Sequence, residues 1–215
     1  IQVGIEKERG KLASEAVFIC QTTEEWSYSH HPSITWFAGR FIAMWSNGKK
    51  DEDAPGQRVL WSASEDFVHW TPPAPLVDSL PGKHSELVLT ADGFYVHGNM
   101  LTAYYGQYEY AQKALDGKER PEGDHDHEGT RLNWMSSGDG RTWRPAEALP
   151  LPVVPNHPPQ ATRSGRLIIS GNISYPYTED PSGQKGWRMA GIYPSAMAAS
   201  VFDDSEGFQW VSEVA

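Results

Sequence analysis

The chain has little of three features that often narrow the search for function. One of its 215 residues is a cysteine, Cys20, so an internal disulfide is impossible. No apolar run approaches the ~18–20 residues of a membrane-spanning helix, and no signal peptide is visible at the start. Lys and Arg number 18 against 28 Asp and Glu, which gives a net charge of −10. We therefore predict no membrane partner and, because phosphate backbones are bound by clustered cations, no nucleic-acid partner.

The sequence also offers no convincing amphipathic helix. Short apolar segments separated by Gly, Pro and Asp turns recur instead, which is the pattern of β-strands. Nine tryptophans and 12% aromatic residues are far too many for a disordered chain. The composition predicts a folded, all-β protein.

Three stretches of small and acidic turn residues each end in a tryptophan: Ser62–Trp70, Met135–Trp143 and Phe202–Trp210. An acid stands four residues before each tryptophan, namely Asp66, Asp139 and Glu206. The spacing of roughly 70 residues, filled by short strands, is typical of radially repeated β-sheets.

Four short strands can be assigned to each repeat. In the first they are Ser33–Phe37, Arg40–Trp45, Arg58–Ser62 and Thr71–Val77. In the second they are Glu86–Leu89, Phe94–Tyr105 after a turn at Ala91–Gly93, Thr130–Met135 and Arg144–Leu149. In the third they are Gln160–Thr162, Arg166–Ile173, Ala196–Phe202 and Val211–Val214. Four antiparallel strands per unit predict the blades of a β-propeller, with an ordinary β-sandwich as the alternative.

The predicted blades span residues 30–78, 83–150 and 156–215, and residues 1–29 belong to a further blade. Propellers carry about 4–8 blades, and a blade without neighbours leaves apolar faces bare. We therefore expect missing sequence or a second chain to complete the circle.

Blade topology places the loop that enters the first strand at the end opposite the tryptophan turns. The three entry loops each carry a histidine: His31, His84 and His157. We expect these side chains to lie around one mouth of the central channel and to be catalytic, because histidine suits acid–base chemistry near neutral pH. His31 is our first choice for the acid–base residue. Carboxylate recognition, metal ligation and simple bonding to loop carbonyls are the open alternatives, and we predict no metal or other cofactor.

Loops rich in aromatic and basic residues reach the same mouth. An aromatic platform beside a cation suits a sugar ring that carries a carboxylate. The expected substrate-binding residues are His30, Tyr105, Arg163, Tyr175, Trp187 and Arg188. The alternative is that the aromatics only pack the loops down. The carboxylate pair of a two-carboxylate glycosidase is not evident here, which favours histidine and tyrosine chemistry.

The stretch Ser136–Trp143 resembles the Asp-box turn (BNR repeat) of sialidase-like propellers, whose pattern is Ser-x-Asp-x-Gly-x-Thr-Trp. Ser136, Gly140, Thr142 and Trp143 match, while Gly138 stands at the aspartate position with Asp139 beside it. The resemblance implies a sialidase-like β-propeller. The early Arg-Ile-Pro segment of true sialidases is absent from this chain, and the histidine-rich mouth is more similar to propeller α-L-rhamnosidases and ulvan-type polysaccharide lyases.

The resemblance to those enzymes implies a secreted or periplasmic carbohydrate-active enzyme that works on a uronic-acid-containing polysaccharide or oligosaccharide. Hydrolysis of α-L-rhamnosidase type, at a rhamnose–glucuronate bond, is the first expectation. Ulvan-type lyase β-elimination, exo-sialidase activity and non-catalytic glycan binding are the alternatives.

Overall fold

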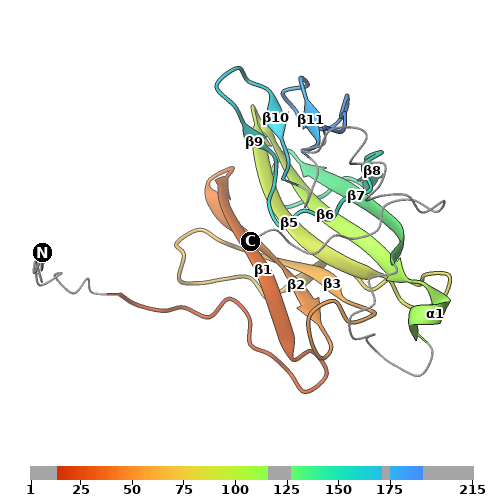
Figure 1. Ribbon diagram of the computed structural model, residues 1–215. Helices are drawn as coiled ribbons and strands as arrows, with labels where there is room; N and C mark the ends of the chain where they lie inside the picture. The colour runs from red at the N-terminus through yellow and green to blue at the C-terminus, as the bar shows by residue number, and fades with distance from the viewer. Residues whose placement is uncertain (1–13, 116–126, 171–174, 191–215) are drawn as a thin grey trace, which may run out of the picture.

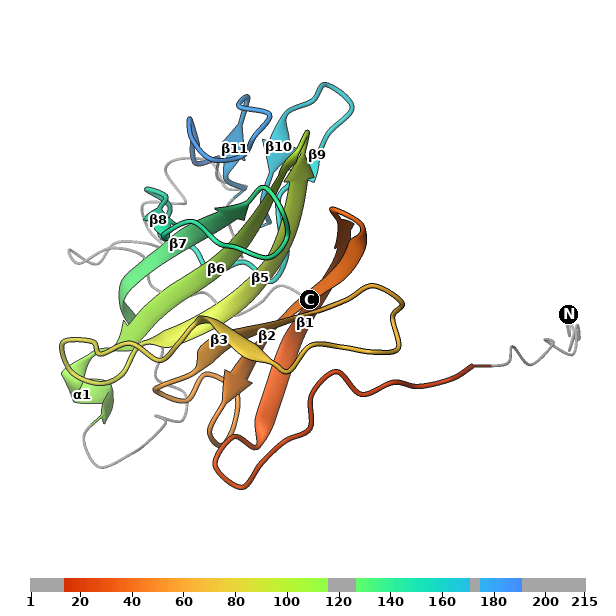
Figure 2. The same cartoon turned by 180° about the vertical axis from the view of Figure 1, so that it is seen from behind.

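Three antiparallel sheets follow one another along the chain (Figures 1 and 2). The structure is a computed structural model that describes residues 14–115, 127–170 and 175–190. The first sheet has the order β1-β2-β3-β4, with strands Tyr28–Phe37, Arg40–Gly48, Arg58–Ser64 and Ala74–Val77.

The second sheet has the order β5-β6-β7-β8, with strands Val88–His97, Met100–Tyr110, His127–Ser137 and Glu147–Ala148. A four-residue helix, α1 (Gln112–Leu115), follows β6. The third sheet has the order β9-β10-β11, with strands Gln160–Ala161, Leu167–Ile168 and Tyr177–Thr178. Each strand pairs with its neighbour in sequence, which is the topology of propeller blades. No helix within the described ranges is long and apolar enough to cross a membrane.

The second repeat differs from the prediction at its first hairpin. The expected turn at Ala91–Gly93 is wrong: β5 runs on to His97, and the chain reverses at Gly98, whose φ is 56°. The register shifts between Ala91 and Gly93, so the Asp-Gly pair forms a β-bulge inside the strand. The segment Phe94–Tyr105 therefore supplies the two arms of a hairpin and is not one strand.

The third sheet also differs from the prediction. The third strand of this sheet is β11, in a segment that we expected to be a loop. Backbone hydrogen bonds between Tyr177 and Arg188, and between Tyr175 and Ala190, add one more edge to it. The strands expected at 196–202 and 211–214, and the turn that ends at Trp210, lie outside the described residues. The blade limits stay predictions.

Two of the tryptophan turns have nearly the same hydrogen bonds, and we call these segments, Ser64–Trp70 and Ser137–Trp143, the aspartate turns. Asp66 Oδ1 accepts the backbone N–H groups of Val68 and His69 at 2.9 and 2.7 Å. Asp139 Oδ1 accepts those of Arg141 and Thr142, both at 2.8 Å. In the second turn the hydroxyl that hydrogen-bonds the aspartate belongs to Ser137. The aspartate of this turn is therefore Asp139, and the Asp-box pattern that we aligned from Ser136 begins one residue later, at Ser137.

The third sheet carries a longer relative of these turns. Asp180 N–H donates to the Thr178 hydroxyl, and the Asp180 carboxylate accepts from Ser182 and from Gln184 N–H. Trp187 closes the segment and donates its Nε1–H to Gly183 O at 2.8 Å. Sequence analysis missed this turn because its tryptophan stands seven residues after the aspartate rather than four.

The Asp139 and Asp180 turns pack against the sheet that precedes each of them. A Cβ on Gly140 would lie 2.7 Å from Ile42 Cδ1 of the first sheet. Tyr104, fully buried in β6 of the second sheet, donates its hydroxyl to Gly183 O of the third at 3.0 Å. Two apolar cores fill the contacts between successive sheets, one around Ile42, Met44, Leu89 and Leu101 and one around Tyr104, Leu132, Leu167 and Trp187. The sheets are therefore stacked as consecutive blades, and the all-β prediction is confirmed.

One face of the first sheet is apolar and open. Ile34 and Trp36 are 48% and 53% exposed, and the Trp36, Phe41 and Phe67 rings contact one another edge-on along this face. Further along this face Ala43, Trp45 and Leu60 are buried against Ile19, Cys20 and Trp70, so the open part is the end around Trp36. In a complete propeller a neighbouring blade buries a surface of this kind. That a further segment or a second chain covers it here stays a prediction.

Candidate functional site

A pocket of about 350 Å³ lies where the three sheets converge. It lies beside the first strand of each sheet, so it occupies the inner edge of the blade array (Figure 1). Its lining comes from β1 (His31, Pro32, Ser33), from β5 (Ala91, Asp92, Gly93) and from the loop before β9 (Asn156, His157, Pro158). Two of the three predicted catalytic histidines, His31 and His157, thus meet in one pocket.

Both long strands at the pocket are irregular where they reach it. The β1–β2 register shifts between His30 and Ser33, and the β5–β6 register shifts between Ala91 and Gly93. His31 has a φ of 50°, which is uncommon for a residue other than glycine. Bulges re-aim side chains and are frequent beside active sites, and backbone strain concentrates at such places.

Asp92 is the most unusual titratable group of the pocket. It is 1% exposed, and neither carboxylate oxygen has a hydrogen-bond partner among the residues that the structure describes. Burial raises the pKa of Asp92 well above its ordinary value, and the nearby backbone N–H of Gly106 offsets only part of this. The carboxyl group therefore favours its protonated, uncharged form. A strongly perturbed carboxyl beside a cleft is a recognised mark of a functional site.

Gly93 brings the three walls of the pocket close together. Its φ is 94°, and an added Cβ would lie 2.9 Å from Ser33 Oγ and 2.9 Å from Pro158 Cδ. A side chain here would therefore be strained by the backbone and would also press on two neighbouring segments.

We expect Gly93→Ala to lower the free energy of unfolding by about 1–3 kcal/mol, the usual range for backbone strain of this kind. Gly98→Ala is the matched control, because Gly98 also has a positive φ but has nothing within 4 Å of an added Cβ. Urea denaturation should show the larger loss for Gly93→Ala. Equal losses in the two variants would contradict the close packing inferred at the pocket.

The third predicted catalytic histidine lies elsewhere. His84 does not line the pocket; its Nε2 is 3.4 Å from Glu128 Oε2. The backbone N–H groups of Lys83 and His84 donate to Glu109 Oε2 at 2.8 and 2.9 Å. This loop is held against the second sheet by Glu109, away from the pocket wall.

Two aromatic residues predicted to bind substrate are structural instead. Tyr105 is 3% exposed in the core between the first and second sheets, and burial raises the pKa of its hydroxyl. Trp187 is 8% exposed and closes the Asp180 turn. For both residues the burial favours the alternative that the aromatics pack the protein.

The other expected substrate-binding residues are scattered. Arg163 is exposed in the turn between β9 and β10, at the strand end away from His157. Tyr175 and Arg188 lie along the edge of the third sheet, where their backbone groups pair with Ala190 and Tyr177. His30 stands next to the pocket and hydrogen-bonds Gln57 Oε1 at 2.9 Å.

Sequence analysis missed Asp92 and Asn156. The signal for Asp92 was present, since an acid stands in the middle of the apolar run Val88–Val96. We interpreted the Asp-Gly pair as a turn, which gave the acid an ordinary structural role.

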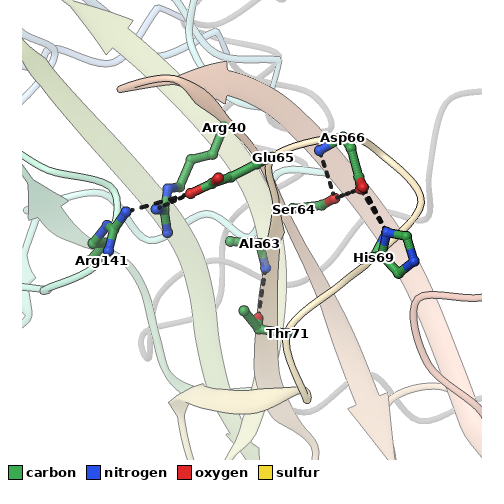
Figure 3. A pocket seen from close by; sticks show the side chains of 8 residues that line it. All are labelled: Arg40, Ala63, Ser64, Glu65, Asp66, His69, Thr71 and Arg141. Atoms are coloured by element: carbon green, nitrogen blue, oxygen red, sulfur yellow. Dashed lines mark hydrogen bonds and ion pairs between the residues drawn. The ribbon is translucent and has the colours of Figure 1, made fainter.

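A second pocket, of about 420 Å³, lies at the aspartate-turn end of the first sheet (Figure 3). Glu65 contacts Arg40 at 3.2 Å and Arg141 at 3.6 Å, and Asp66 Oδ2 lies 2.6 Å from His69 Nδ1. These polar side chains are engaged with one another, and they join the first aspartate turn to the second. We assign this pocket a structural role.

Comparison with known proteins identifies the fold. No family model matches the chain, and no curated protein sequence matches it. Among solved structures, a family 117 glycoside hydrolase from the marine bacterium Zobellia galactanivorans superposes with a TM-score of 0.55 and 10% identity, over 84% of this chain and 61% of that one. A sialidase superposes with a TM-score of 0.52 and 14% identity, over 80% of this chain and 22% of that one.

A third similar structure is the Trypanosoma rangeli sialidase in complex with 2,3-difluorosialic acid, described as a covalent intermediate. It has a TM-score of 0.50 and 16% identity, over 76% of this chain and 30% of that one. The chain spans less than two thirds of the length of each of these proteins. At such low identity the likeness concerns the fold: the chain has the sialidase-like β-propeller fold.

Proposed function

We propose that the protein is a carbohydrate-active enzyme, a glycosidase in the first instance, and that the pocket between His31, Asp92 and His157 is its active site. The observation that carries the proposal is the buried Asp92 carboxyl, which favours its protonated form in a pocket with two histidines. A carboxyl that stays protonated near neutral pH is the general acid that glycoside hydrolysis needs. Similar folds that belong to glycosidases support the proposal without fixing the substrate.

We assign the roles from the chemistry of the three groups. Asp92 is the proposed acid: its buried carboxyl turns towards the pocket and gives its proton to the leaving glycosidic oxygen as the bond from the anomeric carbon breaks. His157, which is exposed at the pocket, takes a proton from the water whose oxygen joins that carbon. His31 holds the substrate's negative group, so Asp92 replaces it as our proposed acid. The volume of about 350 Å³ is at the small end for ligand sites, which favours a terminal sugar residue.

Acidic glycans are the proposed substrate class, with the rhamnose–glucuronate bond as the first linkage to test. Histidine side chains can pair with a uronate, and the chain itself is acidic enough to repel such a substrate elsewhere on its surface. Work on a polysaccharide would place the protein outside the cytoplasm, secreted or periplasmic.

Polysaccharide lyase activity is the second candidate, and the same pair of groups favours it. His157 would remove the proton α to the uronate carboxylate while the Asp92 hydroxyl hydrogen-bonds that carboxylate. The bond to the glycosidic oxygen would break as the double bond forms, and that oxygen would take up the proton that His157 removed. The products differ, because elimination creates an unsaturated uronate that absorbs ultraviolet light and hydrolysis does not.

A screen of acidic glycans with the full-length protein tests the proposal. Reducing ends and ultraviolet absorbance should be recorded for the same reactions. We expect new reducing ends without absorbance from a rhamnose–glucuronate substrate; both signals together would assign the lyase reaction. Retention of oligosaccharide with neither signal would make the protein a binding module and overturn the proposed enzyme activity.

A further inference from the structure

We propose that His30, His31 and Glu52 bind a divalent transition-metal ion, zinc by the chemistry of the ligands, at the rim of the pocket. The metal-ligating atoms of these three side chains all lie within 4.8 Å of one another. His30 Nδ1 is 3.5 Å from Glu52 Oε1, and His31 Nε2 is 4.0 Å from the same oxygen. Two imidazoles and a carboxylate form the ligand set of many zinc sites with an open position.

The backbone is distorted in the way that such a site requires. Successive side chains of a regular strand point to opposite faces of the sheet. His30 and His31 are successive residues of β1, yet their rings lie 4.1 Å apart. The register shift between His30 and Ser33 and the positive φ of His31 bring both rings to the same side. Strain of this kind persists where a function depends on it.

The hydrogen bonds of Gln57 fix which nitrogen of His30 is available. Gln57 is fully buried; its Nε2 donates to Leu89 O at 2.9 Å, and its Oε1 accepts from Asp53 N–H at 3.2 Å. The amide orientation is therefore set, and Oε1 can only accept from His30 Nε2, which lies at 2.9 Å. A neutral His30 must then carry its proton on Nε2 and point the lone pair of Nδ1 at Glu52.

That arrangement sets two electron-rich atoms against each other. Nδ1 of His30 is buried and has no hydrogen-bond partner within the described ranges, and the Glu52 carboxylate lies 3.5 Å from it. Either a proton or a metal ion must lie between them. A ligating histidine usually donates its other N–H to an oxygen, which is what His30 does to Gln57.

The distances favour a metal ion of zinc size. Zinc bonds of about 2.0–2.2 Å in a tetrahedron separate the ligand atoms by roughly 3.3–3.6 Å. The 3.5 Å between His30 Nδ1 and Glu52 Oε1 already fits, and the 4.0 Å to His31 Nε2 needs a small rotation of the half-exposed Glu52 side chain. The ligand nitrogens of the two histidines, which lie within 4.8 Å of each other, would approach as the ion binds. Three protein ligands leave a fourth position open. If the proposed function is right, that position can receive the carboxylate of an acidic glycan beside the pocket, and His31 then holds the substrate's negative group through the metal ion.

Isothermal titration of the metal-free protein with zinc chloride tests the inference directly and needs no substrate. We expect one zinc ion per chain, and Glu52→Gln or His30→Ala should weaken binding by about 100-fold or more. Gln57→Leu should weaken it by about 10–100-fold, because it removes the outer hydrogen bond and not a ligand. His69→Ala is the matched control, since His69 also lies beside a carboxylate but stands at the first aspartate turn, and it should bind zinc as the unaltered protein does.

Cobalt provides a second readout, because the visible absorption of bound Co²⁺ reports ligand number and geometry. The account predicts a tetrahedral or five-coordinate spectrum that Glu52→Gln abolishes. The Glu52 side chain is half-exposed and Gln has the same shape, so we expect this variant to keep the fold. The inference is overturned if the protein binds no zinc, or if zinc binds equally well to Glu52→Gln and His30→Ala. Either result would leave His30 and Glu52 in contact without a metal ion, and it would not bear on whether the pocket cleaves glycans.

Discussion

Asp92→Asn is expected to lower the turnover number by about 10²–10⁴-fold, the usual contribution of a general acid. The substitution keeps the size and shape of the side chain but removes the proton that Asp92 would donate. The Michaelis constant should change little, because the pocket keeps both histidines. Turnover on the substrate found in the glycan screen is the measurement.

The same variant should be more stable than the unaltered protein at neutral pH. The folded state holds the Asp92 proton to a higher pH than the unfolded chain does, since burial raises the pKa in the folded state alone. The contribution of Asp92 to the free energy of unfolding is therefore complete below about pH 3.9, the ordinary pKa that it has in the unfolded chain. This contribution declines as the pH rises towards the higher pKa of the folded state. Asn has no charge to desolvate, so melting curves of Asp92→Asn should lack this decline.

Asp78→Asn is the matched control for both measurements. Asp78 is an exposed carboxylate 3.5 Å from Arg58 and does not line the pocket. We expect its turnover to be unchanged and its stability to differ by no more than about 0.5 kcal/mol, as is usual for surface sites. Full activity in Asp92→Asn, or a loss of turnover as large in Asp78→Asn, would contradict the proposed role of Asp92.

Tyr104→Ala should cause the largest loss of stability that we expect from a single substitution. Tyr104 is fully buried between the second and third sheets, and its hydroxyl donates to Gly183 O in the Asp180 turn. Removal of a large buried side chain costs about 3–5 kcal/mol. Tyr104→Phe should cost about 1 kcal/mol, since it removes one of the two hydrogen bonds to Gly183 O, which keeps the Trp187 Nε1–H as a donor.

Chemical denaturation followed by near-ultraviolet circular dichroism measures both variants. Tyr175→Ala is the control, because Tyr175 is 40% exposed at the edge of the third sheet. We expect it to cost about 0.5 kcal/mol or less. A loss for Tyr104→Ala no greater than that of Tyr175→Ala would mean that the Asp180 turn does not dock on the second sheet.

The repeat could be predicted from sequence because local chemistry defines it. An aspartate that accepts two backbone N–H groups and a nearby serine hydroxyl forms the same turn wherever that spacing occurs, as at Asp66 and Asp139. The turn at Asp180 has three additional residues before its tryptophan, so the search for a fixed spacing did not find it. Strand content followed from apolar segments, but bulges did not, because an Asp-Gly pair serves a turn and a bulge equally well.

The candidate site was only partly predictable because it depends on which face of a strand is buried. Repeat topology brought His31 and His157 to one pocket, and the same reasoning failed for His84, whose loop is held by Glu109. Tyr105 and Trp187 look like sugar-binding aromatics in the sequence, and only three-dimensional packing reveals that they are core residues. The unusual state of Asp92 arises from neighbours far away in sequence, which no local pattern records.

The protonation state of Asp92 tests the account most directly, because the proposed chemistry depends on it and no substrate is needed. The carboxyl carbon can be followed by ¹³C nuclear magnetic resonance during a pH titration of protein labelled at aspartate, with Asp92→Asn used to assign the signal. Burial raises the pKa of Asp92, so we predict that this signal keeps the shift of a neutral carboxyl well above the ordinary aspartate pKa. A carboxyl that titrates near the ordinary value of about 3.9 would contradict the account, since Asp92 would then be ionised and unable to act as the acid.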